Sequence, residues 1–99
     1  MINQERLTQD FAAMQRITAP GEGINRLAFT DSDWEGRAYL MRQMEAAGLT
    51  LRTDAFGNVL GRCAGKDDSL PAILCGSHSD SVPRGGNYDG LTGVLAAIE

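Results

Sequence analysis

The clearest indication of the fold class comes from residues 72–90, AILCGSHSDSVPRGGNYDG. Residues 72–76 form a continuous apolar run between turn-forming residues, which is typical of a central strand buried on both faces of a sheet. The glycine-rich segment that follows predicts a tight loop. LTGVLAAI, at residues 91–98, then predicts the start of a buried helix. This order of strand, loop and helix indicates an α/β fold.

Two amphipathic helices are predicted upstream of this stretch. Residues 3–18 carry apolar side chains at helical spacing, with Asn3 as the N-cap. The pattern recurs over residues 33–47, where Thr30 or Ser32 is the expected cap and Gly48 is the left-handed residue that closes the helix. We expect the buried stripe of this second helix to consist of Trp34, Ala38, Met41 and Met44, widened by Leu40 and Ala47.

A β-hairpin is predicted between the second helix and the central strand. Residues 49–54 alternate between apolar and polar side chains, as in a half-exposed strand, and residues 58–64 form a second strand. The short turn between them indicates antiparallel pairing. An irregular connector at residues 24–30 joins the two helices.

Composition and charge exclude several classes of function. The 99 residues carry a formal net charge of −4, and the nine lysines and arginines are scattered, so no nucleic-acid surface is predicted. No apolar run approaches the ~18–20 residues of a membrane span, and the polar N-terminus lacks the apolar stretch of a signal peptide. Cys63 and Cys75 lie in apolar segments without metal-type spacing, so we expect buried free thiols in a reducing cytoplasm. The apolar helix pattern runs up to Glu99 without a stop signal, which leads us to expect a longer protein.

The chemistry of the chain is concentrated around its only histidine, His78. It follows the predicted central strand, at the edge of an α/β sheet where ligand sites gather. Imidazole nitrogen and carboxylate oxygen are the ligands that a divalent ion prefers, and the glycine-rich loop allows Asp89 to face His78. A ligating histidine also needs a partner on its other ring nitrogen, a role that suits Asp80.

Simpler interpretations of these residues remain open at this point. His78 could be a surface or hydrogen-bonded histidine, and Asp80 and Asp89 could merely form turns. A phosphate-binding loop is disfavoured, because the segment lacks both GxxxxGK[ST] and GxGxxG and its acidic side chains would repel a phosphate.

Residues 76–90, followed by Gly93-Val94-Leu95-Ala96, closely resemble the first metal-binding motif of the M20 metallopeptidase family. The resemblance is narrower to its amidase/hydantoinase branch, which contains N-carbamoyl-L-amino acid hydrolases, allantoate amidohydrolases and β-ureidopropionase-like enzymes. Residues 24–30 and 54–62 resemble that branch as well, so the likeness covers most of the chain.

The resemblance implies a specific site and reaction. Two divalent ions, zinc or manganese, would be bound, with His78 on one ion, Asp89 bridging both and Asp80 supporting the site. The ions would activate a bridging water to cleave C–N bonds of linear amides or N-carbamoyl amino acids. The general base and the remaining ligands of the family would follow Glu99, so the 99 residues are expected to be inactive alone.

The resemblance also implies an architecture. Residues 1–99 would be the N-terminal portion of the catalytic domain of a binuclear-zinc hydrolase, and a smaller inserted dimerisation domain would lie outside them. A cytoplasmic homodimer acting on a small-molecule amide is expected, with no nucleic acid or membrane as partner.

The sequence leaves open two alternative functions and the roles of two arginines. The whole protein could be an aminoacylase or peptidase of the same fold, or a non-catalytic scaffold with an incomplete metal site. Arg26 is a further site candidate, against the alternative of a structural ion pair. Arg84 lies in the glycine-rich loop and is expected to be solvated.

Overall fold

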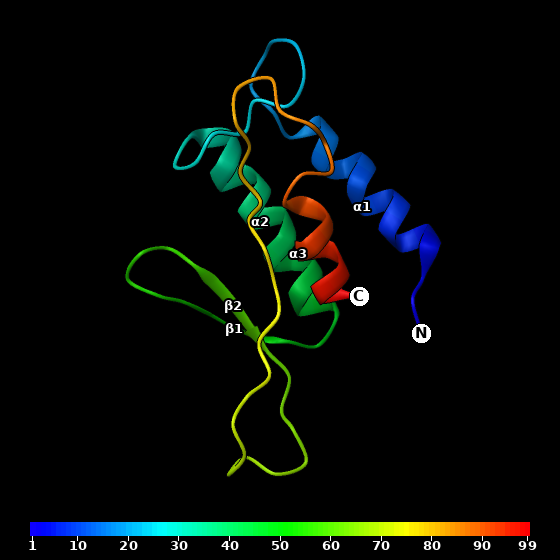
Figure 1. Cartoon of the computed structure of the whole chain (residues 1–99), viewed down its shortest axis with the longest axis vertical. Coiled ribbons are helices and arrows are strands. Elements are labelled where there is room, and N and C mark those ends of the chain that lie inside the picture. The colour runs from blue at the N-terminus through cyan, green and yellow to red at the C-terminus, as the bar shows by residue number, and fades with distance from the viewer.

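The computed structural model describes all 99 residues. The elements follow in the order α1 (Gln4–Arg16), α2 (Asp31–Ala46), β1 (Thr50–Thr53), β2 (Val59–Arg62) and α3 (Leu91–Ile98). Figure 1 shows the three helices lying together, with the β-hairpin beside α2 and a long connection leading from β2 back to α3. No helix combines the length and the apolar character needed to cross a membrane.

The helices begin and end largely where local sequence predicts. The Asn3 side chain accepts a hydrogen bond from the Arg6 amide at 3.0 Å, which caps α1 as expected. Gly48, at φ +85°, follows the end of α2. The helix α2 begins two residues earlier than predicted, at Asp31. Thr30 occupies its N-cap position, but the Thr30 hydroxyl donates to the Leu27 carbonyl instead of capping the helix.

The predicted hairpin is confirmed. Strands β1 and β2 pair antiparallel, with Thr50 opposite Arg62 and Thr53 opposite Val59. The turn between them is closed by Asp54, whose Oδ1 accepts hydrogen bonds from the amides of Phe56, Gly57 and Asn58 at 2.9–3.0 Å. Its Oδ2 accepts from the Asn58 side chain at 2.8 Å. One carboxylate therefore organises the whole turn.

The Asp54 turn predicts an acid-sensitive hairpin. The hydrogen bond from the Asn58 side chain, aided by the backbone amides, lowers the pKa of Asp54 below its ordinary value of 3.8. The stabilisation is therefore fully present above that value and is lost as the pH falls through the lower folded-state pKa. We expect Asp54→Asn to lower the melting temperature at neutral pH and to narrow the difference in melting temperature between about pH 6 and about pH 2.5.

The matched control for the Asp54 turn is Glu22→Gln, which removes one exposed carboxylate whose side chain makes no hydrogen bond or ion pair. Thermal unfolding followed by circular dichroism measures both variants. An equal pH-dependence in the wild type and Asp54→Asn would contradict the role given to Asp54.

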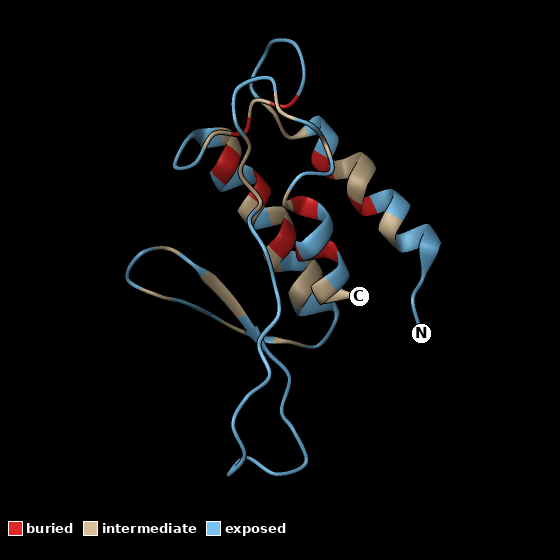
Figure 2. Ribbon diagram, in the orientation of Figure 1, coloured by how far each residue is buried: buried red, intermediate tan, exposed pale blue.

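The core forms where the three helices face one another. It consists of Met14 from α1, Leu40 from α2, and Leu91, Val94 and Leu95 from α3. Figure 2 shows these buried positions on the facing sides of the helices. The apolar start of α3, predicted as buried from sequence, is confirmed.

The predicted stripe of α2 is wrong in part. Trp34 is 51% exposed, and Ala38 and Ala47 are exposed as well. The buried residues of α2 are instead Asp33, Gly36 and Leu40. Trp34 faces outward, where the Arg37 guanidinium lies over its ring, 4.8 Å from the centroid. The face with Gly36 turns inward because the buried side chain of Arg26 packs against it.

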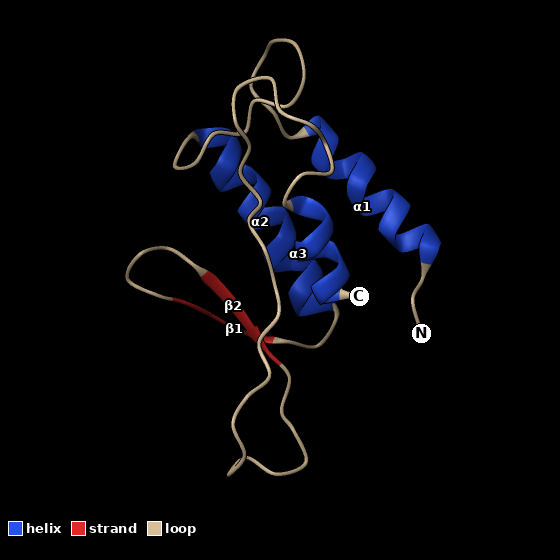
Figure 3. Ribbon diagram, in the orientation of Figure 1, coloured by secondary structure: helices blue, strands red, loops and turns tan.

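The predicted central strand at residues 72–76 is also wrong for this chain. Residues 71–80 form neither strand nor helix, and Ile73 and Leu74 are 98% and 84% exposed. Figure 3 shows the two hairpin strands as the only strands, with the 72–76 run in the long connection. A strand requires hydrogen-bonding partners on a neighbouring strand, and the hairpin does not pair with this run. Cys63 and Cys75 were predicted to be buried thiols. This prediction is also wrong, because both are exposed free thiols.

Candidate metal centre

The candidate site lies where the loop after residue 76 crosses the start of α3. Gly90, at φ +67°, precedes the helix, and the His78 ring packs directly against it. A Cβ at position 90 would lie 2.5 Å from Nε2 and 2.6 Å from Nδ1 of that ring. One turn on, a Cβ at Gly93 would lie 2.6 Å from the Ser77 Cβ. These two glycines therefore let the histidine loop approach α3 closely.

The two ring nitrogens of His78 face the two predicted aspartates. Nδ1 lies 3.1 Å from the carbonyl oxygen of Asp80 and 3.3 Å from Oδ1 of the Asp80 side chain. A carbonyl oxygen can only accept, so the hydrogen bond to Asp80 requires the proton on Nδ1. The lone pair of the neutral ring then lies on Nε2, which is 3.8 Å from Oδ2 of Asp89. The structure thus brings His78, Asp80 and Asp89 together.

The spacing of this pair suits a metal ion better than a direct hydrogen bond. A distance of 3.8 Å between Nε2 and Oδ2 is too long for a hydrogen bond. Two ligands that each lie ~2.0–2.2 Å from one zinc ion at a tetrahedral angle are roughly 3.3–3.6 Å apart. The His78 ring is 53% exposed and the Asp89 side chain 80% exposed, so an ion can reach both from solvent.

The donor set fits zinc or manganese but is not a complete site. Imidazole nitrogen with carboxylate oxygen is the combination that these ions accept. No group of three or more histidine, cysteine, aspartate or glutamate side chains is placed to hold one ion. His78 and Asp89 therefore offer at most two donor groups, where a tetrahedral ion needs four.

Arg84 and Arg26 differ in their burial and in the contacts of their side chains. Arg84 is exposed, and its side chain makes no hydrogen bond or ion pair. Arg26 is 2% exposed and forms no ion pair, so the predicted structural ion pair is wrong. Its guanidinium instead donates to the backbone carbonyls of Met14, Ile17 and Ser79. Sequence pattern indicated nothing of this, because the partners are main-chain atoms scattered along the chain.

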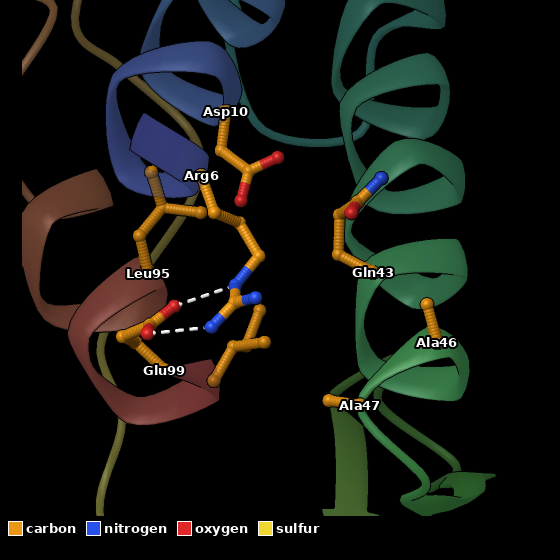
Figure 4. A pocket seen from close by; sticks show the side chains of 8 residues that line it. Arg6, Asp10, Gln43, Ala46, Ala47, Leu95 and Glu99 are labelled. Carbon is orange, nitrogen blue, oxygen red and sulfur yellow. Dashed lines mark hydrogen bonds and ion pairs between the residues drawn. The ribbon is translucent and has the colours of Figure 1, made fainter. Parts of the chain in front are cut away.

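A separate hollow of about 360 Å³ lies between the three helices, towards the end of α3 that is remote from Gly90. Figure 4 shows Arg6 reaching across it to Glu99 through two hydrogen bonds, of 2.6 and 2.8 Å. The other carboxylate of the hollow, Asp10, accepts from the Tyr39 hydroxyl at 2.5 Å. Both carboxylates are thus already engaged, and the hollow adds no ligand to the candidate site.

Several known proteins resemble the chain in sequence and in structure. No family model matches it. It is 44% identical over 95 residues to an N-carbamoyl-L-amino-acid amidohydrolase of Paenarthrobacter aurescens, covering 96% of this chain and 23% of the relative. It is 47% identical over 81 residues to a ureidoglycolate hydrolase of Arabidopsis thaliana, covering 82% of this chain and 17% of the relative.

A solved structure shows the same likeness. The crystal structure of a hydantoinase/carbamoylase family amidase from Burkholderia ambifaria superposes with a TM-score of 0.92 at 42% identity, covering 99% of this chain and 24% of that one. The chain therefore spans between about a sixth and a quarter of the length of these proteins. Its helices and hairpin match the N-terminal part of such structures. The chain belongs to the hydantoinase/carbamoylase family of amidases.

Proposed function

We propose that this chain provides the first ligands of a binuclear metal site in an amidohydrolase of the M20 type. The observation that carries the proposal is the arrangement around His78, whose Nε2 faces Oδ2 of Asp89 at 3.8 Å while Nδ1 is held by Asp80. The names of the relatives support the hydrolase part of the proposal, since they are amidohydrolases and a hydrolase.

Each of the three residues has a distinct role in this proposal. His78 holds one ion through Nε2. Asp89 would be the ligand shared by both ions, because its negative charge can offset part of the repulsion between neighbouring dications. Asp80 keeps the imidazole in one tautomer and orientation, as the second partner of a ligating histidine commonly does. Bound ions of this kind would polarise a carbonyl group and lower the pKa of a bound water towards ~7.

The substrate we propose is a linear amide or ureido compound of small size. The relatives act, by name, on N-carbamoyl-L-amino acids and on ureidoglycolate, and the family resemblance adds allantoate. The general base and the remaining ligands would come from other parts of the whole protein, meaning the amidohydrolase of which we propose this chain to be a part. A homodimer and a cytoplasmic location belong to the same proposal.

Removal of metal tests this function. The whole protein, freed of ions by a chelator, should lose hydrolysis of N-carbamoyl-L-amino acids, allantoate or ureidoglycolate by about a hundredfold or more, because ions supply several kcal/mol of stabilisation to such reactions. Adding Zn²⁺ or Mn²⁺ back should restore it. Ammonia release and amino acid release measure the reaction, with the untreated enzyme carried through the same dialysis as control.

The assay also separates the alternatives. Hydrolysis of N-acyl amino acids or dipeptides, but of none of the ureido compounds, would indicate an aminoacylase or peptidase. Full metal loading without hydrolysis of either class would indicate a scaffold. Activity that survives complete removal of metal would contradict the proposal.

A further inference from the structure

A buried arginine lies directly behind the candidate site. Ser79 stands between His78 and Asp80, and its carbonyl oxygen accepts a hydrogen bond from Nε of Arg26 at 2.8 Å. Arg26 is 2% exposed, so water does not compete for this contact. The guanidinium therefore holds the main chain at Ser79, between the proposed ligand His78 and the proposed supporting residue Asp80.

The other side of the same guanidinium is anchored on α1. Nη1 of Arg26 donates to the carbonyl oxygens of Met14 at 2.9 Å and Ile17 at 2.7 Å. These carbonyls lie at the C-terminal end of the helix, where the last carbonyls lack partners within the helix and the dipole favours a cation. Arg26 thus connects a rigid element to the histidine loop.

The main chain of Arg26 adds further connections to the loop. The Ser81 amide donates to the Arg26 carbonyl at 2.8 Å, and the Arg26 amide donates to the Ser81 hydroxyl oxygen at 3.0 Å. That hydroxyl donates in turn to the Ile24 carbonyl at 3.0 Å. Residues 24–26 therefore hold the segment from Ser79 to Ser81 through both main-chain and side-chain atoms.

The surroundings of Arg26 are built to accept its bulk and charge. A Cβ at Gly36 would lie 2.8 Å from the Arg26 Cδ, so the glycine in α2 leaves the space that this side chain fills. Burial lowers the pKa of Arg26, and the nearby charges of Asp33 and Asp80 oppose that effect. A buried cation satisfied by three carbonyl oxygens is costly to remove. The Ile17 and Ser79 carbonyls would be left without a donor, whereas the Met14 carbonyl also accepts from the Ile17 amide.

We infer that Arg26 is a positioning residue for the proposed metal site. By fixing the Ser79 carbonyl, it sets the path of the chain from His78 to Asp80, so that Nδ1 meets Asp80 and Nε2 faces Asp89. In this role Arg26 would act through the Ser79 carbonyl and would touch neither the ion nor the substrate. The inference rests on the proposed function, since it assumes that His78 and Asp89 bind metal.

Cobalt binding to the whole protein tests the inference without relying on activity. Arg26→Met should weaken Co²⁺ binding by about 10–100-fold, the usual cost of losing a partner that orients a ligand, and should change the visible absorption spectrum of the bound ion. Arg26→Lys keeps the charge but not the fork of donors, so it should recover only part of the affinity. Arg84→Met, the same substitution at an exposed arginine, should match the wild type.

Ser81→Ala provides a second variant in case Arg26→Met does not fold. It removes only the Ser81 hydroxyl bonds and should weaken Co²⁺ binding several-fold. Wild-type affinity and spectrum in folded Arg26→Met, or in Ser81→Ala, would overturn the inference, as would an equal loss in Arg84→Met. Failure of the proposed function looks different: the wild type would bind no Co²⁺, or would bind it equally well after His78→Ala.

Discussion

Asp89→Asn and His78→Ala should each leave the whole protein folded while lowering its bound zinc or manganese from two ions to one or none. Asp89 is 80% exposed and His78 53% exposed, so neither side chain supports the core. Asparagine keeps the shape of Asp89 but loses the charge that a bridge between two dications needs. Because each ion contributes several kcal/mol to such a reaction, hydrolysis should fall roughly a thousandfold.

Metal analysis of the purified variants, together with ammonia release, measures both effects. Asp68→Asn is the matched control, since it makes the same substitution at an exposed carboxylate whose only ion pair is the exposed contact with Arg62. It should retain wild-type metal content and activity. Unchanged metal content in both His78→Ala and Asp89→Asn would refute the assignment of the site.

Gly90→Ala should be the most damaging substitution that replaces no proposed ligand. The backbone at Gly90 has φ +67° and ψ −51°, a combination that L-residues rarely adopt and that costs such a residue about 1–3 kcal/mol. The new Cβ would also occupy the position of the His78 ring, since it would lie 2.5 Å from Nε2. The imidazole must therefore move away from Asp89, and a displacement of ~1 Å in such a site can reduce the rate about a hundredfold.

The matched control for Gly90→Ala is Gly86→Ala in the same loop. A Cβ at Gly86 meets no atom within 4 Å, and its φ is not positive, so alanine fits there. Metal content and activity of the two variants should differ sharply, with Gly86→Ala close to wild type. Equal values for the two variants would mean that close approach of His78 to Gly90 does not matter for the site.

Sequence pattern predicted the elements that local interactions stabilise. The α1 cap at Asn3, the Gly48 stop after α2 and the antiparallel hairpin were all anticipated, because each depends on residues only a few positions apart. The buried face of α2 was not anticipated. It is determined by Arg26, which lies outside the helix and packs against Gly36. The predicted strand at residues 72–76 failed for a related reason: its partners are not supplied by the hairpin.

The candidate site, too, was predicted from the sequence only in part. His78, Asp80 and Asp89 could be named from residue type, order and family resemblance, since ligand chemistry depends on side-chain identity. Which ring nitrogen faces which aspartate, and the packing of the imidazole on Gly90, come from the path of the loop over α3. Arg26 shows the difference most clearly. Its three carbonyl partners lie at residues 14, 17 and 79, and main-chain acceptors separated so widely leave no trace in a linear pattern. Short-range order is encoded locally, whereas a buried cation finds its partners only when distant segments pack together.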